Sequence, residues 1–205
     1  MLESAARTRQ PTAHRTKISP EDYATLISCA FYSEKQDIIF TAALIICLFR
    51  AFLRVGEVRS LKKSDLIPDG SFSFSINVAK SKTDQTSRGA CVKFVLQPNS
   101  QELRLLNKHI NNVHSLPSPF LFPSQSTKRP LSAATISTKL RNLFQLAGLE
   151  NKGYTSHSFR GGAASTALEQ GFDSSRVMSA GRWRSSKSFQ AYIRPSALNI
   201  IIPPK

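Results

Sequence analysis

The stretch HSFRGGAASTALEQGFDSSRVMSAGRWRSSKSFQAYIR, residues 157–194, holds the polar residues that most need an explanation in this chain. His157 and Arg160 would share one face of a helix, because residues three positions apart are neighbours there. An arginine can grip two oxygens of a phosphate, and an imidazole exchanges protons near neutral pH. A helix-capping histidine beside a surface arginine would give the same pattern. The pair therefore raises the question of an anion site without answering it.

Two further features of this stretch are unusual for packing alone. Gly161 and Gly162 follow the arginine directly, and each glycine inside a helix costs about 1 kcal/mol. We therefore predict that another part of the chain approaches this helix closely. Trp183 is the only tryptophan. Tyr192 follows it in an amphipathic segment, where a core tyrosine is the alternative interpretation.

The chain is strongly basic. Its 205 residues include 28 Lys and Arg against 13 Asp and Glu, which gives a formal net charge of +15. Such an excess favours a nucleic-acid partner, because each neutralised phosphate releases counterions; a charge that serves solubility is the alternative. With 40% hydrophobic residues, the chain is long enough for one folded domain with a single core.

Several classes of protein are disfavoured. The cysteines are widely spaced and form no pattern typical of a zinc site; they are Cys29, Cys47 and Cys91. The chain does not begin with an apolar segment of the signal-peptide kind, and its longest apolar run is too short to cross a membrane. We expect a protein of a reducing compartment that is not secreted and has no membrane partner, nuclear in a eukaryote and cytoplasmic otherwise.

Apolar periodicity predicts a chain that is mainly helical. Ser19 as an N-cap and Pro20 at the first helical position mark the start of the first helix. Residues 1–17 lack this periodicity and are interpreted as a basic linker or arm. Further helices are expected over residues 35–53, part of 54–66, 100–113, 132–148, 157–169, 174–182 and 186–194.

A small sheet is expected in the first half of the chain, because residues 71–82 and 90–96 alternate between apolar and polar. The apolar face would carry Phe72, Phe74, Ile76, Val78, Val92 and Phe94. The predicted fold class is mainly α with a small antiparallel three-stranded sheet (α+β).

Arg54 stands where the apolar second helix ends and the chain turns. An arginine that interacts with the helix dipole would be found at the same place. Glu57, three residues on, is interpreted as a supporting carboxylate that fixes the local geometry.

Taken in order, Arg54-x-x-Glu57, a sheet that carries a lysine, His157-x-x-Arg160, Trp183 and Tyr192 resemble the signature of the tyrosine recombinase (phage integrase) family. The interval from Trp183 to Tyr192 matches the family's spacing before its nucleophile. The resemblance covers roughly residues 18–200. The phrases FLRVGE and GRWRSSKSFQAYIRP look most like those of Crypton or DIRS-like recombinases of eukaryotic mobile elements.

The resemblance implies a site that cuts and rejoins DNA without a metal or any other cofactor. Tyr192 would attack the phosphodiester and form a 3′-phosphotyrosyl link, which conserves the bond energy for rejoining. Arg54 and Arg160 would hold the non-bridging oxygens, and His157 would help to take the tyrosine proton. Trp183 stands where many members have histidine. Its indole N–H donates a hydrogen bond, but the ring accepts no proton.

The resemblance also implies a lysine that protonates the departing 5′ oxygen. Lys82, at the mouth of the hairpin, is the better candidate. Lys80 has the same side-chain parity on an extended strand and stays open, and a solvated hairpin charge is the third interpretation. Residues expected to contact DNA are Lys80, Arg182, Arg184 and Lys187.

The expected partners are double-stranded DNA and further copies of the chain in a tetramer. The C-terminal segment, which includes the apolar LNIII, would dock on a neighbouring copy, or fold back on its own core. Family members usually carry an N-terminal core-binding domain that completes a clamp around DNA. We expect residues 18–205 to form a catalytic domain without it.

Together these features predict the catalytic domain of a site-specific recombinase or transposase. A type IB topoisomerase-like enzyme would use similar chemistry and would relax supercoils as a monomer. A domesticated DNA-binding module that no longer cuts is a third interpretation. A generic RNA-binding domain is disfavoured, because the stacking motifs of the common RNA-binding modules are missing from the sequence.

Overall fold

The computed structural model describes residues 16–79 and 89–197. It confirms a mainly helical fold with a three-stranded antiparallel sheet. The elements in the described residues are α1 (Pro20–Phe31), α2 (Gln36–Arg50), α3 (Val55–Ser60), the 3₁₀ turn η1 (Lys63–Asp65), β1 (Leu66–Pro68), β2 (Ser73–Val78), β3 (Ala90–Val95), α4 (Gln101–His114), α5 (Ala133–Leu146), the 3₁₀ turn η2 (Glu150–Lys152), α6 (Ser156–Glu169), α7 (Ser174–Gly181) and α8 (Ser186–Gln190).

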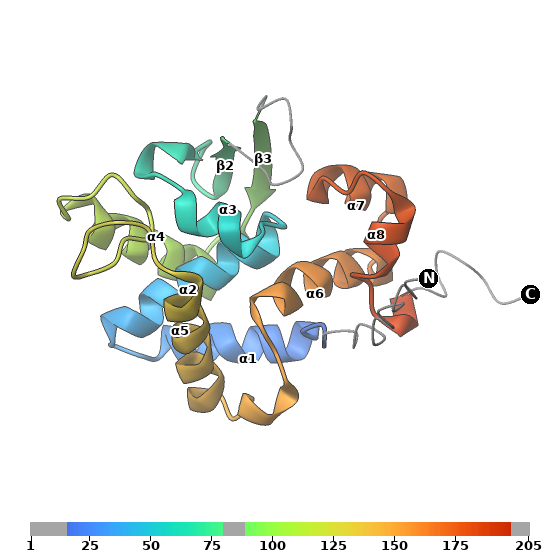
Figure 1. Cartoon of the computed structure of the whole chain (residues 1–205), viewed down its shortest axis with the longest axis horizontal. Helices are drawn as coiled ribbons and strands as arrows, with labels where there is room; N and C mark the ends of the chain where they lie inside the picture. Colours follow the sequence, from blue (N-terminus) through green and yellow to red (C-terminus); the bar gives the residue numbers. More distant parts are fainter. Residues whose placement is uncertain (1–15, 80–88, 198–205) are drawn as a thin grey trace, which may run out of the picture.

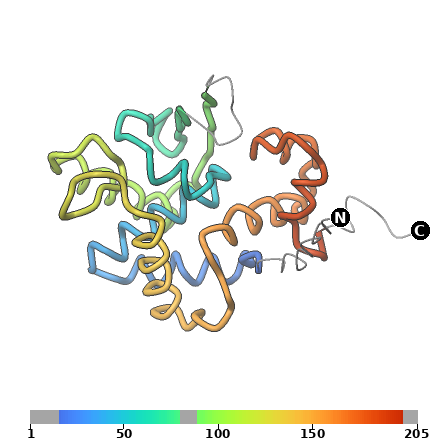
Figure 2. The backbone as a smooth tube through the Cα atoms, in the orientation of Figure 1, coloured from blue at the N-terminus to red at the C-terminus, as the bar shows by residue number. Residues whose placement is uncertain are grey.

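The helix α2 forms the centre of the core. Its side chains are buried around most of the helix, as its nearly continuous apolar sequence predicts. It contacts α1, α3, α4, α5 and α6, which therefore pack around it. Figure 1 shows α1 along one side of the molecule and the sheet on the opposite side, and the tube in Figure 2 follows the same path. Among the described residues, every helix is too short or too polar to span a membrane.

The sheet has the strand order β1-β2-β3, with both pairs antiparallel. Phe74 pairs with Phe94 across β2 and β3, and their rings stack with centroids 5.4 Å apart. Phe72 does not join this apolar face as expected. It lies before the start of β2 and is 41% exposed. The remaining strand of the sheet, β1, is only three residues long, and the sequence did not predict where it lies.

Two helices end earlier than predicted. The second helix ends at Arg50 rather than at residue 53, because Phe52 adopts a left-handed conformation with φ 49° and turns the chain. The last helix, α8, ends at Gln190, so Tyr192 lies beyond it. Both differences concern segments that carry expected site residues.

The predicted close approach at Gly161 and Gly162 is found. A Cβ on Gly161 would lie 2.6 Å from the backbone oxygen of Tyr192 and 2.9 Å from Cγ of Lys17. A Cβ on Gly162 would overlap the backbone of Ile18. The two glycines therefore let the start of the domain and the segment of Tyr192 cross α6 at one place.

The C-terminal helices are attached to the rest of the domain by a second, smaller apolar cluster. Its buried members are Ala164, Leu168, Val177, Trp183, Phe189, Ile193 and Ala197. Trp183 lies at its centre, with its ring edge-to-face with those of Phe52, Phe189 and Tyr192. The position of Tyr192 therefore depends on a small cluster rather than on the main core.

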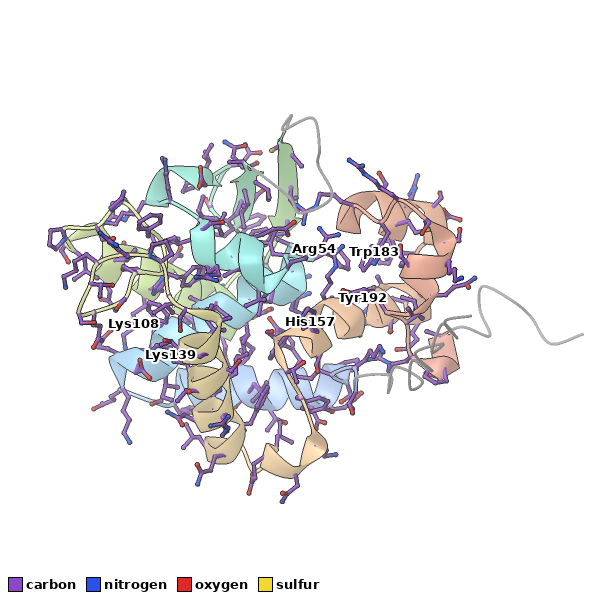
Figure 3. All side chains as sticks on the ribbon, viewed as in Figure 1. Arg54, Lys108, Lys139, His157, Trp183 and Tyr192 are labelled. Carbon is purple, nitrogen blue, oxygen red and sulfur yellow. The ribbon has the colours of Figure 1, made fainter. Side chains whose placement is uncertain are left out.

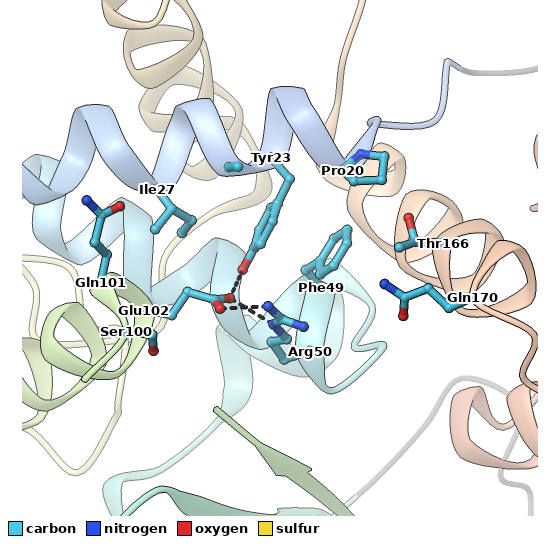
Figure 4. Close-up of a pocket in the computed structure, with 11 residues that line it drawn as sticks. Pro20, Tyr23, Ile27, Phe49, Arg50, Ser100, Gln101, Glu102, Thr166 and Gln170 are labelled. Carbon is cyan, nitrogen blue, oxygen red and sulfur yellow. Dashed lines mark hydrogen bonds and ion pairs between the residues drawn. The ribbon is translucent and has the colours of Figure 1, made fainter. Parts of the chain in front are cut away.

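A cluster of polar side chains, from Tyr23, Arg50 and Glu102, joins α1, α2 and α4 (Figure 4). The hydroxyl of Tyr23 donates to Glu102 Oε1 over 2.6 Å. Arg50 donates to both oxygens of the same carboxylate, from Nε over 2.8 Å and from Nη2 over 2.6 Å. One guanidinium therefore balances one carboxylate in this cluster.

His109 is buried between aromatic rings in the main core. It is 3% exposed, its ring stacks on that of Phe122 with centroids 4.9 Å apart, and its Nε2 lies 3.0 Å from the carbonyl oxygen of Leu121. Only the Nε2–H form of the ring can donate to that oxygen. Burial lowers the pKa of His109 from 6.5 to about 4, so the fold holds the neutral ring.

We expect acid to destabilise the protein through His109. Stability from a lowered pKa is fully present above 6.5, the value in the unfolded chain, and is lost as the pH falls towards 4. The difference corresponds to roughly 3 kcal/mol of unfolding free energy. Urea unfolding at several pH values measures it. In His109→Gln, which keeps a donor for Leu121, this part of the pH slope should disappear. If the unfolding free energy of His109→Gln depends on pH as steeply as that of the wild type, the role assigned to His109 is wrong.

Candidate active site

Arg54 begins α3 rather than ending α2, because it is the N-cap residue of the short helix. Glu57 Oε2 accepts from the backbone N–H of Arg54 over 2.8 Å, and Oε1 accepts from its Nη1 over 2.9 Å. Glu57 is only 4% exposed. The carboxylate thus fixes both the backbone and the side chain of Arg54, which is the geometry expected of a supporting residue.

Arg160 is the most deeply buried charged group of the site, at 1% exposed. Its Nη1 donates to the carbonyl oxygen of Phe52 and its Nη2 to that of Gly181. The guanidinium carbon lies 4.0 Å from the centroid of the Trp183 ring and 5.8 Å from that of Tyr192. Burial, and then the charge of Arg54, lower the pKa of Arg160 to about 9.

Within the described residues, the acceptors of Arg160 are carbonyl oxygens of the chain itself, in addition to the phosphate oxygens that it is predicted to hold. Arg160 comes from α6, while Phe52 lies after α2 and Gly181 ends α7. The guanidinium therefore joins three segments through their carbonyl oxygens. The Tyr192 ring lies beside it.

Arg182 was expected to contact DNA, which stays a prediction; within the chain its partner is Glu57. Its Nη2 donates to Glu57 Oε2 over 2.8 Å, and its side chain is 17% exposed. It caps α7 in a left-handed conformation with φ 59°, which a residue with a Cβ rarely adopts. Burial lowers the pKa of Arg182; the charge of Arg54 lowers it further and that of Glu57 opposes the shift.

Trp183 packs directly over Gly181. A Cβ on that glycine would overlap the indole ring, so no larger residue fits there. Trp183 is 7% exposed, and its Nε1 has no acceptor among the described residues. The indole therefore presents a buried N–H donor beside Arg160, as the sequence suggested for this position.

Tyr192 lies in the turn after α8, where its backbone N–H donates to Phe189 over 2.8 Å. Its ring is 5.7 Å from that of Trp183, centroid to centroid. Figure 3 shows Arg54, His157, Trp183 and Tyr192 gathered in the region between α3, α6 and the C-terminal helices. His157 is half-buried in the first turn of α6. Residues from distant parts of the sequence thus meet in one place.

Sequence reasoning missed the residues that hold the segment after Tyr192. Arg194 donates from its backbone N–H to Ser165 Oγ over 2.8 Å, and its Nη1 donates to the carbonyl oxygen of Ile18 over 2.7 Å. The same guanidinium forms an ion pair with Glu169. A buried serine on α6 and an arginine two positions after a tyrosine are common residues, so no sequence signal singled them out.

Two of the expected residues lie outside this cluster, and two others lie outside the part of the chain that the structure describes. Arg184 and Lys187 are exposed, next to and within α8, and their contact with DNA stays a prediction. Lys80 and Lys82 lie outside the described residues, in the connection between β2 and β3.

The site has more donors than acceptors. Buried nitrogens without an acceptor among the described residues are Arg160 Nε, Arg182 Nε, Arg182 Nη1 and Trp183 Nε1. Buried polar atoms of folded proteins are normally paired, so this group is unusual. Every one is a donor and most are cationic, which favours an oxygen-rich anion as a ligand. Among the described residues, no three His, Cys, Asp or Glu side chains meet in a way that could hold a metal ion.

The fold and this cluster of arginines, histidine, tryptophan and tyrosine define a domain of the tyrosine recombinase type. The model of the phage integrase family matches residues 17–198, and the chain belongs to that family. An integrase/recombinase xerD homolog of Selenomonas ruminantium is 29% identical over 200 residues. These cover 93% of the chain but 58% of that relative, so the chain spans little more than half of its length.

Solved structures show the same fold. The XerA recombinase has a TM-score of 0.72 at 22% identity, over 98% of this chain and 68% of that one. XerH in a post-cleavage complex with its palindromic difH substrate has a TM-score of 0.72 at 17% identity, over 88% of this chain and 50% of that one. A lambda integrase tetramer on a Holliday junction has a TM-score of 0.61 at 20% identity, over 93% and 51% of the two chains.

We expect Gly161→Ala to disturb the site more than the fold. The new Cβ would press on the Tyr192 carbonyl and on Lys17, and relieving such overlap costs about 1–3 kcal/mol. Cleavage of a nicked DNA duplex should slow by at least about tenfold, since small displacements of reacting groups cost large factors in rate. Gly56→Ala in α3 is the matched control, because its Cβ would meet nothing within 4 Å. Equal behaviour of both variants would contradict the role of the close approach.

Proposed function

We propose that this chain is the catalytic domain of a site-specific DNA recombinase that cuts and rejoins strands through a 3′-phosphotyrosyl intermediate. Tyr192 is the proposed nucleophile. The observation that carries the proposal is the meeting of its ring with the Arg160 guanidinium and the Trp183 indole in a site that also contains Arg54 and His157. Membership of the phage integrase family supports it.

The chemistry follows from the groups that the site contains. Attack on a phosphodiester places extra negative charge on the phosphorus oxygens, and fixed guanidinium groups stabilise that charge in a site that excludes water. Arg54 and Arg160 fulfil this role in the proposal, and Trp183 adds an indole donor. His157 takes the proton of Tyr192. Lys82, with Lys80 as the alternative, protonates the departing 5′ oxygen. No step requires a metal.

Double-stranded DNA is the proposed substrate, in agreement with the net charge of +15. The active assembly is proposed to be a tetramer on paired sites, as lambda integrase is on its Holliday junction. Up to Ala197 the chain packs on its own α6, since that residue belongs to the second apolar cluster. Docking of the following residues, which lie outside the described part, on a neighbouring copy remains a proposal.

The sequence also led to a finer prediction, which concerns the subgroup of the family. The expected likeness to Crypton or DIRS-like recombinases rests on the phrases around Arg54 and Trp183. The relatives reported above are instead Xer recombinases and a xerD homolog of Selenomonas ruminantium. These support a site-specific recombinase, and a role in transposition stays a prediction.

A nicked suicide duplex tests the chemistry. The nick lets the short strand diffuse away after cleavage, so the protein should stay covalently attached and migrate with DNA on a denaturing gel. Tyr192→Phe removes the nucleophilic oxygen and should abolish this band while DNA binding remains. If the wild type forms no covalent band on a panel of candidate sites, the domain is better described as a DNA-binding module that does not cut.

The choice of arginines is tested with matched substitutions. Arg160→Lys keeps the charge but loses the fork that reaches two carbonyl oxygens. We expect cleavage at saturating protein to slow by about 100-fold, comparable to the loss of one oxyanion donor, with little change in DNA affinity. Arg104→Lys on α4, whose guanidinium lies over the Phe31 ring, is the control and should cleave at the normal rate. Equal losses would mean that the site has been placed wrongly.

A further inference from the structure

Arg182 is a third guanidinium group at the site, and it comes from the end of α7. It caps α7 with φ 59°, where glycine would fit without strain. Its side chain turns inward, and Nη2 reaches Glu57 Oε2 over 2.8 Å. That oxygen also accepts from the backbone of Arg54. Arg182 and Arg54 therefore donate hydrogen bonds to the same carboxylate, that of Glu57.

The remaining donors of Arg182 lack acceptors. Its Nε and Nη1 are both buried and have none among the described residues. The same is true of Arg160 Nε and Trp183 Nε1. Leaving buried donors unpaired costs about 1–3 kcal/mol each, and more for charged groups. Arg50 shows the contrast, because its Nε and Nη2 are both satisfied by Glu102. Nη2 thus holds the side chain of Arg182 in place, and Nε and Nη1 remain to bind a ligand.

The charges of the site also favour an anionic ligand. Arg54, Arg160 and Arg182 act on one another electrostatically and share a single carboxylate, Glu57. Among the described residues, Arg160 and Arg182 alone bring more positive charge than this one carboxylate can balance. A phosphodiester carries one negative charge and gains a second as the tyrosine oxygen attacks. A site of this charge fits the transition state better than the ground state, which is the condition for catalysis.

We propose that Arg182 is a catalytic residue that contacts the scissile phosphate through Nε and Nη1, in addition to Arg54 and Arg160. Glu57 holds the Arg182 side chain in the orientation that presents these two donors. The inference rests on the proposed strand cleavage, and it adds a third phosphate ligand to that site.

Substitutions at Arg182 can separate its charge from its backbone. Arg182→Gly and Arg182→Asn both tolerate the left-handed conformation, so the turn into Trp183 should survive. We expect single-turnover cleavage of the nicked duplex to slow by 10- to 100-fold in both. Arg176→Gln removes the same charge from an exposed position on α7 and should cleave at the normal rate. Wild-type rates in the two Arg182 variants would overturn the proposal.

A neutral phosphate distinguishes a phosphate ligand from a residue that only holds Glu57. In a duplex with a methylphosphonate at the cleavage position, one charged oxygen is replaced by a methyl group. If Arg182 neutralises that oxygen, the loss in Arg182→Asn should shrink to less than about threefold on this duplex, since the two changes remove one interaction. An equal loss on both duplexes would mean that Arg182 acts only by positioning, and would overturn the proposal.

Binding of inorganic phosphate is a readout that does not need cleavage. Trp183 is the only tryptophan of the chain, so intrinsic fluorescence reports on the site directly. Phosphate should change the emission of the wild type, and Arg182→Asn should weaken the apparent affinity at least fivefold relative to Arg176→Gln. If this holds while the wild type never cuts DNA, strand cleavage is refuted and the anion site at Arg182 stands. Equal affinities in the two variants would refute the role of Arg182.

Discussion

The guanidinium of Arg160 is the group on which the rest of the site depends. It is buried, and it donates to carbonyl oxygens of Phe52 and Gly181, which lie far apart in the sequence. A buried charge is stable only where it is well paired. The turn after α2, the middle of α6 and the end of α7 must therefore meet at one point. The left-handed conformation of Phe52 and the missing side chain at Gly181 are the local conditions for this meeting.

The arginine–glutamate groups around Glu102 and Glu57 differ in how completely their donors are paired. Around Glu102, one arginine and one tyrosine satisfy the carboxylate, and the cluster joins three helices. Around Glu57, the guanidinium groups of Arg54 and Arg182 bond to the carboxylate and that of Arg160 lies within its electrostatic influence, and several buried donors have no acceptor among the described residues. The first arrangement is complete in the folded chain. In the proposed function, a phosphate group supplies the missing negative charge and acceptors to the second arrangement.

Much of this organisation could be predicted from the sequence. Ser19 and Pro20 begin α1, Ser19 caps it as expected, and the pair of glycines marks a close approach. The order of basic and aromatic residues indicated the family. The sequence could not show that Arg160 bonds to carbonyl oxygens, because backbone acceptors have no sequence signature. The contact of Arg182 with Glu57 could not be predicted either, since nothing in the sequence indicates a left-handed arginine at this position. The strand β1 is too short for alternation to be recognised.

The crossing at Gly161 and Gly162 has a mechanical consequence. Ile18 bonds to α6 through its N–H and accepts from Arg194 through its carbonyl oxygen, while Lys17 lies against Gly161 beside the Tyr192 backbone. Tension or rotation applied to the chain ahead of Lys17 would therefore be transmitted to the tyrosine through only a few covalent and hydrogen bonds. The entry to the domain is thereby mechanically coupled to the proposed nucleophile.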